Sequence, residues 1–537
     1  MATRRAFLRT CLERQEVLEA LFLASPGLVQ AMDGWRQDPN SRQGKRVERA
    51  LVKYLYRMAG RATPFGLFAG ISTGRMGDHT CLRFDAAGHY QRHTRLDMQI
   101  ITDLADHLAG DPAIQPFLRW RPNNSLYQVA DGLRYVEAVH GDSGFRSHSL
   151  VEIQANAHLG KVLDAARPGA TLLELAEVLV DDRITRETAL AFLRELIKRQ
   201  ILYADIVPAV TGVDPLSSLL MCLRQGEGGV KIAGFLERIQ LELREIDHRP
   251  LGANLASYQA ISQLLKALPF GETRLDAFQV DLVRSASGLT LGPRVLEDLR
   301  LGVSLLHRLS PSATVTYFSR FIKDFEFRYG AREVPLTEVL DDELGIGFHA
   351  DGRPNIDDSH LFERIWFRQE NEENMAWEPR HNHLLHLLRG TDKNHDSVIR
   401  LSAADLEKIA PPTNLELPDS FVVFAELAAA VPEDIDQQDY KLFVKCVAGP
   451  PASRMLARFC NGDNELLNHV QGLAMDEERL NPDAIYAEIV HLPFGRTGNV
   501  LMRPLLRKYE IPYLGQSGAG AEFEIPVTDL LLSVRQG

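Results

Sequence analysis

The chain has 537 residues and a mass of 60.2 kDa. Domains usually hold about 100–150 residues, so about two to four domains are expected. With 45% hydrophobic and 25% charged residues, the composition is that of a folded globular protein and excludes a disordered or fibrous chain. The net charge of -12 disfavours a protein that coats nucleic acid non-specifically, but it leaves room for one RNA bound at a local basic patch.

Sequence patterns that mark export or membrane insertion do not occur. No run of about 18 uncharged apolar residues is present, and the apolar stretch Phe421–Val431 is interrupted by Glu426. The first residues contain neither the apolar core nor the small-residue cleavage site of a signal peptide. The 5 cysteines are odd in number and never spaced C-x-x-C, which argues against a disulfide framework or a zinc ribbon. We therefore predict a cytoplasmic protein without a membrane span.

The first predicted elements are helices. The pattern of residues 11–32 predicts a helix that is stopped at Ser25-Pro26-Gly27, because proline disfavours its continuation. A second helix is predicted over residues 42–58, where apolar side chains recur at three-and-four spacing: Val47, Leu51, Tyr54, Leu55 and Met58. A loop over residues 59–66 follows, and short strand-like runs stand at residues 81–84 and 135–138.

Residues 125–207 are predicted to form a compact unit. Short strands near 126–129, 134–138 and 147–153 precede helices near 155–166, 171–181 and 186–199, and a strand at 201–203 ends the unit. This order is the outline of a winged helix-turn-helix. Its core stripe is predicted at Leu172, Leu175, Ala176 and Leu179. No basic recognition face is evident, so the unit suits a peptide ligand as well as DNA.

The rest of the chain mixes helices and strands. Helices are predicted near residues 228–245, 255–267 and 291–309, around a strand at 277–283, and the last third carries strand-like runs at 421–424, 442–447 and 485–491. The predicted fold class is α+β, multi-domain, with mixed sheets and helices. The predicted domains are an N-terminal α+β segment, the winged-helix-like unit, a helix-rich α+β core and a C-terminal α/β segment, over residues 1–124, 125–207, 208–416 and 417–537.

Common catalytic signatures are mostly missing. Neither a Walker phosphate loop nor an H-E-x-x-H motif occurs. One G-x-S-x-G lies at residues 70–74, but the glycines and the aspartate that follow at 74, 77 and 78 break the helix that a nucleophile elbow needs. His381, His383 and His386 could share a helix face, yet no carboxylate or thiolate motif accompanies them. We predict no metal site.

A basic stripe is the strongest charge pattern in the chain. Cations recur at spacings of three or four on the helix face opposite the apolar positions: Arg42, Arg46, Arg49, Lys53 and Arg57, with Arg61 in the loop beyond. Like charges so placed repel by a few tenths of a kcal/mol per pair, and only Glu48 lies near enough in sequence to offset them. The stripe is either a solvated surface or a polyanion site, since arginine makes bidentate contacts with phosphate.

The segment Arg57–Gly70, with the sequence RMAGRATPFGLFAG, resembles the hallmark segment of the LanB-type lantibiotic (class I lanthipeptide) dehydratases. Further motifs of the same family pattern follow one another along the chain: Glu19–Pro26, Arg328–Leu336, Asp341–Gly347, Leu456–Phe459 and Leu492–Val500 with Arg503-Pro504 behind it. Because these motifs are ordered and span nearly the whole chain, the resemblance is far more specific than any single motif.

The resemblance implies chemistry that depends on a charged tRNA. Such enzymes take glutamate from glutamyl-tRNA and esterify it onto Ser or Thr of a ribosomally made precursor peptide. A separate elimination domain then expels glutamate and leaves dehydroalanine or dehydrobutyrine. The unit at 125–207 would correspond to the element that captures the leader of the peptide by strand addition to an exposed sheet edge. Glutamyl-tRNA is the expected co-substrate, with no other cofactor and no metal.

The resemblance also implies roles for individual residues. By matching position, the glutamylation site would contain Arg57, Arg61, Thr63, Asp97, Asp281 and Arg458. The stripe residues Arg42, Arg46, Arg49 and Lys53 would bind the tRNA. Arginines can hold the RNA terminus or the glutamyl carboxylate, and an aspartate can orient or deprotonate the attacking hydroxyl. The structural alternative for both aspartates is an ion pair with Arg95 or Arg284.

Full-length members of this family are much longer, and residues 527–537 read like the middle of a domain. The expectation is therefore a glutamylating module whose elimination domain is on a separate protein, with a cyclase and the precursor peptide as further partners, no DNA, and a homodimer as the usual assembly of the family. Two alternatives stay open. One is a ligase of the same scaffold that adds an amino acid from aminoacyl-tRNA to a peptide C-terminus with ATP, and the other is a leader-binding scaffold without catalytic activity.

Overall fold

The computed structural model describes residues 2–140, 146–266, 268, 277–310, 317–348, 377–390, 401–410, 416–449, 451–493 and 495–535. Helices alternate with small two- and three-stranded sheets, which confirms the predicted α+β class. The contacts divide the chain into two compact units. Unit 1 comprises Met1–Gly74, Arg83–Leu289 and Met455–Asp529, and unit 2 comprises Arg75–Leu82, Thr290–Arg454 and Leu530–Gly537. Each unit is built from segments distant in sequence, and the four predicted domain ranges stay a prediction.

Unit 1 begins with four helices: α1 (Ala2–Cys11), α2 (Gln15–Ala24), α3 (Pro26–Gln37) and α4 (Arg42–Gly60). The prediction of one helix over 11–32 is wrong in its bounds. Helix α2 ends at Ala24, and Pro26 starts α3 because the first helical position needs no backbone N–H. The helix predicted over 42–58 is confirmed as α4. Its Val47 and Leu51 are buried in the core of the unit, as the spacing predicted.

A three-stranded sheet in the order β1-β10-β4 lies at the centre of unit 1. Strand β10 (Phe278–Val283) pairs in parallel with β1 (Gly66–Ile71) and antiparallel with β4 (Gln91–Leu96). Successive side chains of a strand point to opposite faces of the sheet. The side chains of Val280 and Leu282 on one face are buried in the apolar core. The opposite face therefore receives Asp281, between these two residues.

The core face of the sheet also carries a buried ion pair. Arg92 of β4 binds the carboxylate of Glu19 from α2, and the same guanidinium donates to the backbone carbonyl of Ile246 at 3.0 Å. Burial raises the pKa of Glu19, against the opposing charge of Arg92. Because a buried charge is costly unless it is paired and hydrogen-bonded, this contact fixes α2 against the sheet. Glu19 belongs to the first family motif, and its place in the core is structural.

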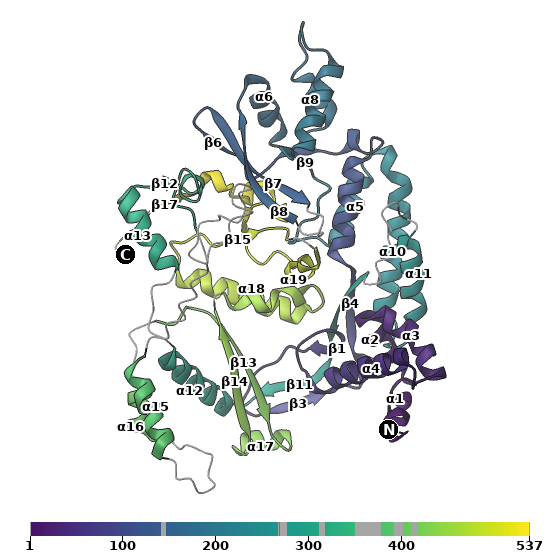
Figure 1. The fold of residues 1–537 in the computed structure, drawn as a ribbon, viewed down its shortest axis with the longest axis vertical. Coiled ribbons are helices and arrows are strands. Elements are labelled where there is room, and N and C mark those ends of the chain that lie inside the picture. The colour runs from purple at the N-terminus through teal and green to yellow at the C-terminus, as the bar shows by residue number, and fades with distance from the viewer. Residues whose placement is uncertain are drawn as a thin grey trace. The chain divides into compact units, whose positions relative to one another are not determined.

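Further elements complete unit 1. Its further helices include α5 (Met98–Gly110), α9 (Pro215–Leu223), α10 (Val230–His248), α11 (Leu255–Lys266), α18 (Asn464–Leu480) and α19 (Gly498–Leu501). Strand β5 (Trp120–Pro122) pairs with β9 (Leu202–Ala204), and β15 (Ala487–Val490) pairs with β16 (Tyr509–Pro512). Helices α10 and α11 lie side by side (Figure 1). The helices predicted near 228–245 and 255–267 and the strand at 277–283 are confirmed.

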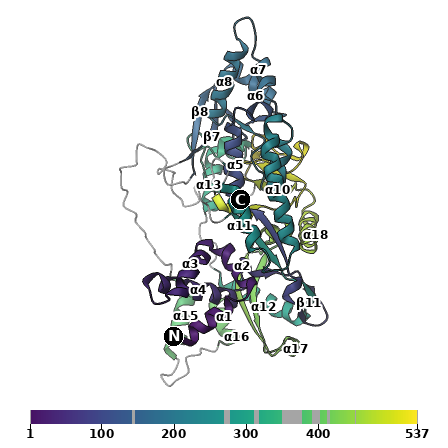
Figure 2. The same ribbon diagram turned by 90° about the vertical axis from the view of Figure 1, so that its right-hand side faces the viewer.

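The segment predicted as a winged-helix-like unit contains the expected elements. A sheet in the order β6-β7-β8 is built from Tyr127–Val129, Gly132–His140 and Arg146–Gln154. Helices α6 (Ala157–Ala166), α7 (Leu172–Glu177) and α8 (Arg186–Lys198) gather beside it (Figure 2). A capping box between Thr171 and Glu174 starts α7. The predicted core stripe of this segment is buried, and its description as a winged helix stays a prediction.

Unit 2 is made of helices and two strand pairs. Its helices are α12 (Pro293–Leu309), α13 (Tyr317–Tyr329), α14 (Leu336–Val339), α15 (Pro379–Gly390), α16 (Ala403–Ile409) and α17 (Pro432–Asp436). Strand β13 (Val422–Ala428) forms a hairpin with β14 (Lys441–Ala448), and β12 (Val334–Pro335) pairs with β17 (Leu531–Leu532). Besides these pairs, the short strands β2 (Arg75–Met76), β11 (Ala286–Leu291) and β3 (Cys81–Phe84) form a three-stranded sheet in that order, and the ranges of β3 and β11 fall partly in unit 1. No described helix of either unit is long and apolar enough to cross a membrane.

Two family motifs meet inside unit 2. Arg328 at the end of α13 donates to the backbone carbonyl of Gly345 at 2.8 Å. Asp341 is buried and accepts from the backbone N–H of Leu344 at 2.8 Å. Both contacts satisfy backbone groups of one turn, which packs beside the buried Tyr329. These motifs therefore carry the fold of unit 2.

We predict that Asp247→Asn stabilises the protein at neutral pH. Asp247 accepts from the backbone N–H of Thr94 at 3.1 Å, but its Oδ1 is buried without a partner among the described residues. Burial raises the pKa of this carboxyl to about 6. Between the unfolded-state pKa near 3.9 and this value, the folded state binds more protons, so its stability falls as the pH rises from about 4 to about 6.

An asparagine does not titrate, so the variant does not lose this stability as the pH rises. The difference in the free energy of unfolding between the Asp247→Asn variant and the wild type should therefore be up to about 3 kcal/mol larger at pH 7.5 than at pH 4, measured by urea unfolding at both pH values. Asp182→Asn, at an exposed position, is the control. An equal effect of Asp247→Asn at both pH values would contradict the prediction.

Candidate active site

The signature loop ends beside Asp281. In the register of the central sheet, Asp281 lies between Gly66 of β1 and His93 of β4. Gly66 has a φ of 51°, a left-handed conformation that glycine adopts without strain. The loop over residues 59–66 therefore joins the strand that neighbours Asp281. This placement follows from strand pairing, which no local pattern in the sequence reveals.

Two arginines hold the Asp281 carboxylate. Asp281 is 6% exposed, and its oxygens lie 3.2 Å from Arg95 and 2.6 Å from Arg458. Arg458 comes from a short 3₁₀ helix at Ala457–Asn461, far from β4 in sequence. Gln279, two positions earlier on β10, donates to the same carboxylate at 3.2 Å. The structure thus brings together the predicted residues Asp281 and Arg458, and it confirms the ion pair between Asp281 and Arg95.

The two guanidinium groups keep unused hydrogen-bonding capacity. The Nε atoms of Arg95 and Arg458 are buried and have no partner in the described part of the chain. Burial lowers the pKa of Arg95, and the carboxylate of Asp281 opposes this effect. Buried donors are normally satisfied, so these two mark a place where a bound anion or water would gain hydrogen bonds.

His93 is a neutral group in the same cluster. It stands opposite Asp281 on β4. Burial, and then the charge of Arg95, lower the pKa of His93 below its usual value. The imidazole is therefore neutral at neutral pH and able to accept a proton. His93 was not predicted from the sequence, because only the register of β4 against β10 places it beside Asp281.

Asp97 belongs to a second network at the end of β4. It caps helix α5, with Oδ1 accepting from the backbone N–H of Gln99 at 3.0 Å. Its Oδ2 accepts from Arg496 Nε at 2.6 Å and from Asn499 Nδ2 at 3.0 Å. The alternative that Asp97 pairs with Arg95 or Arg284 is wrong, because the chain brings Arg496 to this carboxylate. Arg284 instead donates to the hydroxyl of Tyr90.

The two aspartate networks are adjacent. Arg95, which binds Asp281, and Asn499, which binds Asp97, line the same small cavity together with Asp214. Its volume of about 10 Å³ is at the lower limit for one water molecule. Arg496 and Asn499 come from the motif at 492–500, which the family pattern marked without assigning a role to either residue. Phe494 of that motif lies outside the described residues.

The loop residues themselves are partly exposed. The Arg57 guanidinium lies over the ring of Phe65, 4.5 Å from its centroid, in a cation–π contact. Arg61 and Thr63 are exposed, and no contact within the described ranges joins either of them to Asp281 or Asp97. The roles predicted for Arg57, Arg61 and Thr63 stay predictions.

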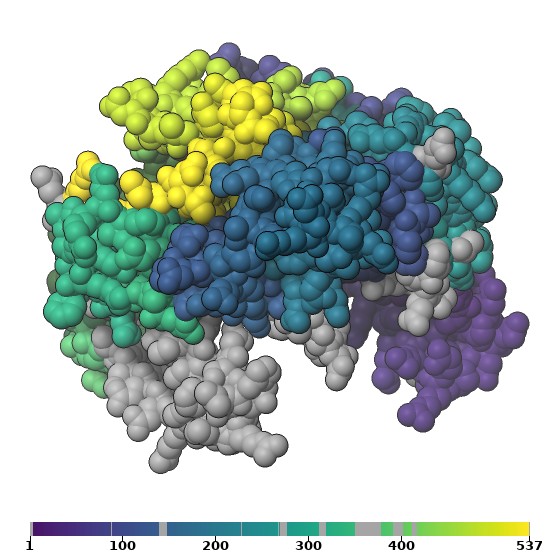
Figure 3. All heavy atoms as spheres, turned by 90° about the horizontal axis from the view of Figure 1, so that it is seen from above, coloured from purple at the N-terminus to yellow at the C-terminus, as the bar shows by residue number. Residues whose placement is uncertain are grey.

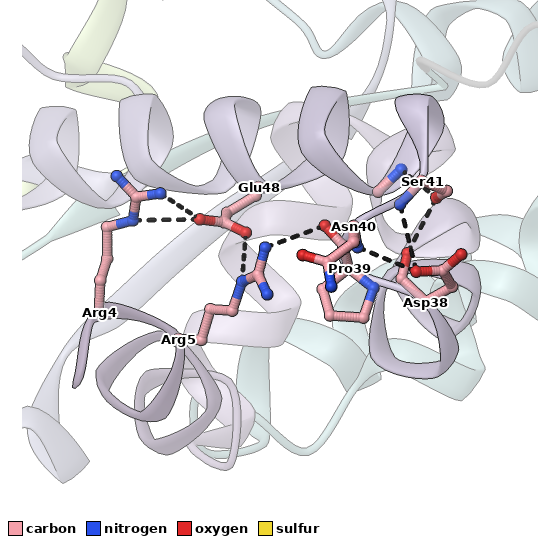
Figure 4. Close-up of polar contacts among 8 residues, drawn as sticks. Arg4, Arg5, Asp38, Pro39, Asn40, Ser41 and Glu48 are labelled. Atoms are coloured by element: carbon pink, nitrogen blue, oxygen red, sulfur yellow. Dashed lines mark hydrogen bonds and ion pairs between the residues drawn. The ribbon is translucent and has the colours of Figure 1, made fainter. Parts of the chain in front are cut away.

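The basic stripe of α4 is solvent-facing. Its four predicted tRNA-binding residues are all exposed: Arg42, Arg46, Arg49 and Lys53. The sequence suggested that Glu48 offsets their charge, but Glu48 is buried and binds Arg4 and Arg5 of α1 instead (Figure 4). The Arg5 Nε–Glu48 Oε2 distance is 2.8 Å. Among the described residues, no acidic side chain forms an ion pair with the four cations.

The G-x-S-x-G segment and the histidine cluster both make structural contacts. The hydroxyl of Ser72, in the G-x-S-x-G segment, donates to the backbone carbonyl of Arg284 at 2.7 Å. His383 Nε2 lies 2.9 Å from the carboxylate of Asp405, and His381 accepts from the backbone N–H of Glu378. In the part of the chain that the structure describes, no group of three or more His, Cys, Asp or Glu side chains is placed to hold a metal ion.

Comparison with known proteins identifies similarities over nearly the whole chain. The model of the family described as lantibiotic dehydratase, N terminus, matches residues 13–537. The chain is 21% identical to the epidermin biosynthesis protein EpiB of Staphylococcus epidermidis, over 76% of this chain and 39% of that protein. It is 23% identical to the subtilin biosynthesis protein SpaB of Bacillus subtilis, over 61% of this chain and 32% of that protein. The chain thus matches less than half the length of these curated relatives.

Two solved structures share the fold. The tRNA-dependent lantibiotic dehydratase MibB from Microbispora sp. 107891 matches with a TM-score of 0.79 and 22% identity, over 99% of this chain and 51% of that one. The glutamylation domain of TbtB, from thiomuracin biosynthesis, matches with a TM-score of 0.60 and 18% identity, over 98% of this chain and 64% of that one. At these identities the similarity establishes the fold.

We predict that Asp281→Asn destabilises the fold strongly, because it removes the carboxylate that pairs with the buried Arg95 and with Arg458. Removing one partner of a buried ion pair typically costs about 3–5 kcal/mol, and the free energy of unfolding in urea should fall by this amount. Asp476→Asn is the matched control, since Asp476 pairs with Arg479 and both side chains are exposed. Its cost should stay below about 0.5 kcal/mol. Equal effects of the two substitutions would refute the role given to Asp281.

Proposed function

The chain belongs to the lantibiotic dehydratase N-terminal family, and we propose that it transfers glutamate from glutamyl-tRNA to Ser or Thr side chains of a precursor peptide. One observation carries the proposal: Asp281, held by Arg95 and Arg458, lies in register with the end of the signature loop. A tRNA-dependent dehydratase and a glutamylation domain share the fold over nearly all of this chain, which supports the same chemistry here.

The proposed reaction is an ester exchange. The peptide hydroxyl oxygen attacks the glutamyl carbonyl carbon, the bond from that carbon to the ribose oxygen of the tRNA breaks, and the hydroxyl proton ends on the ribose oxygen. The ester is already activated, so the protein has to align the reactants and stabilise the developing oxyanion. Arg95 and Arg458 carry buried, unpartnered Nε donors suited to an anion, and the neutral His93 can relay the proton.

We propose that the leader of the peptide binds to strand β8. In the sheet β6-β7-β8 the outer edge of β8 is a strand edge, and such edges accept an added strand. The edge of β7 that faces away from β8 cannot accept an added strand at Ala138. Gln200 already hydrogen-bonds both the N–H and the carbonyl of Ala138, at 2.9 and 2.8 Å. Asn123 bonds the carbonyl of Val136 in the same way. Of the two edge strands, β8 has 9 residues and β6 only 3, so strand addition is proposed at β8.

We propose that the basic stripe of α4 holds the tRNA backbone. Its cations are exposed and without acidic partners in the described residues, since Glu48 is bound to α1. Unneutralised arginines on one helix face attract phosphates and release counterions when they bind. In this scheme the product is a glutamyl ester on the peptide, and its elimination belongs to a separate catalytic domain.

The direct test is the intact mass of a precursor peptide, encoded beside this gene, after incubation with the chain and glutamyl-tRNA. We expect the mass of one glutamyl residue per modified hydroxyl and no loss of water, without ATP. Arg61→Ala should lower the rate by about 100-fold, as expected when a charge-stabilising donor is removed, while the melting temperature is unchanged because Arg61 is exposed.

The control for this variant is Arg238→Ala on the exposed face of α10. If Arg61→Ala reacts at the wild-type rate, Arg61 does not belong to the glutamylation site. Addition of an amino acid to the peptide C-terminus in an ATP-dependent reaction would favour the ligase alternative. A peptide that binds and is never modified would favour the scaffold alternative.

The role of the stripe is tested by salt dependence. Replacing Arg46 and Arg49 together by Ala should reduce the slope of log affinity for tRNA against log salt concentration by about 1.4–1.8, since each lost phosphate contact is worth roughly 0.7–0.9. The affinity for the peptide should stay unchanged. Fluorescence anisotropy with labelled tRNA at several salt concentrations measures the slope, and Arg238→Ala is again the control. An unchanged slope would leave the stripe as a solvated surface.

A further inference from the structure

Unit 1 contains a second and larger cavity, of about 450 Å³. Its walls come from helix α5, strands β7 and β9, and the residues around Leu492 and Leu514. Figure 3 shows the blue residues of the winged-helix-like segment packed against the yellow residues that follow position 500. Asn124 accepts from the Leu514 N–H at 2.8 Å and donates to the Gly515 carbonyl at 2.7 Å, and these bonds join the two segments. The cavity has the volume of a typical ligand site.

The wall of this cavity is mostly apolar. The apolar side chains that line it include Ala109, Val136, Ala138, Ile197 and Leu202. Three amides of the wall are bonded within the protein: Asn124 to the Gly515 carbonyl, Gln200 to the backbone of β7, and Gln516 to the carbonyl of Ala204 at 2.9 Å. The cavity therefore suits apolar side chains.

The cavity lies between strand β8, where the leader is proposed to bind, and the Asp97 network, which adjoins the Asp281 cluster. Thr102 lines it and stands on α5 only ~7 Å along the helix axis from Asp97. Leu492 lines it four positions before Arg496, which binds Asp97. On the other side His148 of β8 lines it, with its ring 6.3 Å from that of His491. A chain that runs from β8 to Asp97 therefore passes this cavity.

We propose that the cavity binds an apolar segment of the precursor peptide, close to the Ser or Thr that is modified. The inference rests on the proposed function and adds a substrate preference to it. An extended peptide advances ~3.3 Å per residue, so the apolar side chains would stand about two or three positions from the hydroxyl. A nucleoside is the less suitable occupant, because most of the lining is apolar.

The test uses a fluorescein-labelled peptide, acetyl-Leu-Phe-Ser-Leu-amide, as the probe. Ala109 lines the cavity, so Ala109→Phe fills it and should weaken binding of the probe at least about tenfold. Ala260→Phe is the matched control, because it makes the same change at an exposed position of α11 and should bind as the wild type does.

The same variants are then compared with the full precursor peptide. Ala109→Phe should raise the KM for glutamylation at least about tenfold, while the affinity for a peptide that contains the leader alone stays unchanged. The unchanged leader affinity also shows that the variant is folded. Unchanged probe binding and unchanged KM in Ala109→Phe would overturn the inference and leave the proposed function standing.

Two further outcomes distinguish a failure of this inference from a failure of the proposed function. If the wild-type chain never glutamylates the precursor but binds the probe in a way that Ala109→Phe blocks, the proposed function fails and the cavity is still a site for apolar peptide. If adenosine 3′-monophosphate displaces the probe, and Ala109→Phe abolishes its binding too, the cavity receives the RNA terminus and the inference is wrong.

Discussion

The alternation of side chains along β10 and β4 is the constraint on which the candidate site depends. One face of the central sheet packs into the core, with Val280 and Leu282 buried there, and the other face holds Asp281 between Arg95 and Arg458. Both faces carry a buried ion pair, since Arg92 on the core side binds Glu19. A register slip of one residue would exchange the two faces. The pairing of the strands therefore determines both the core and the cluster.

The family motifs divide into those that build the fold and those that meet at the cluster. Glu19, Arg328 and Asp341 satisfy buried charges or backbone groups, so their substitution would act on stability first. Arg458 and Arg496 instead reach the carboxylates of Asp281 and Asp97 from the C-terminal part of unit 1. Loss of activity in a motif variant therefore identifies a catalytic group only when the variant is as stable as the wild type.

Helices, strands and many of their positions could be predicted from the sequence, because they depend on local patterns. The spacing of Val47 and Leu51 predicted the buried face of α4, and the alternating pattern around Val280 predicted β10. The predicted bounds failed at Pro26, which ends one helical pattern and begins the next helix. Proline is unfavourable inside a helix and favourable at the first helical position. The local sequence alone does not show which of the two applies at Pro26.

The sequence by itself determined the family, the α+β class, the basic stripe and the two aspartates, because each depends only on residue identity and short-range spacing. The tertiary structure alone decided which charges meet. Glu48 lies within the stripe in sequence but binds α1, and Asp97 is paired with Arg496 from almost 400 positions away. His93 gains its significance only from the strand pairing that places it beside Asp281. Long-range contacts depend on how distant elements pack, and no local pattern records that packing.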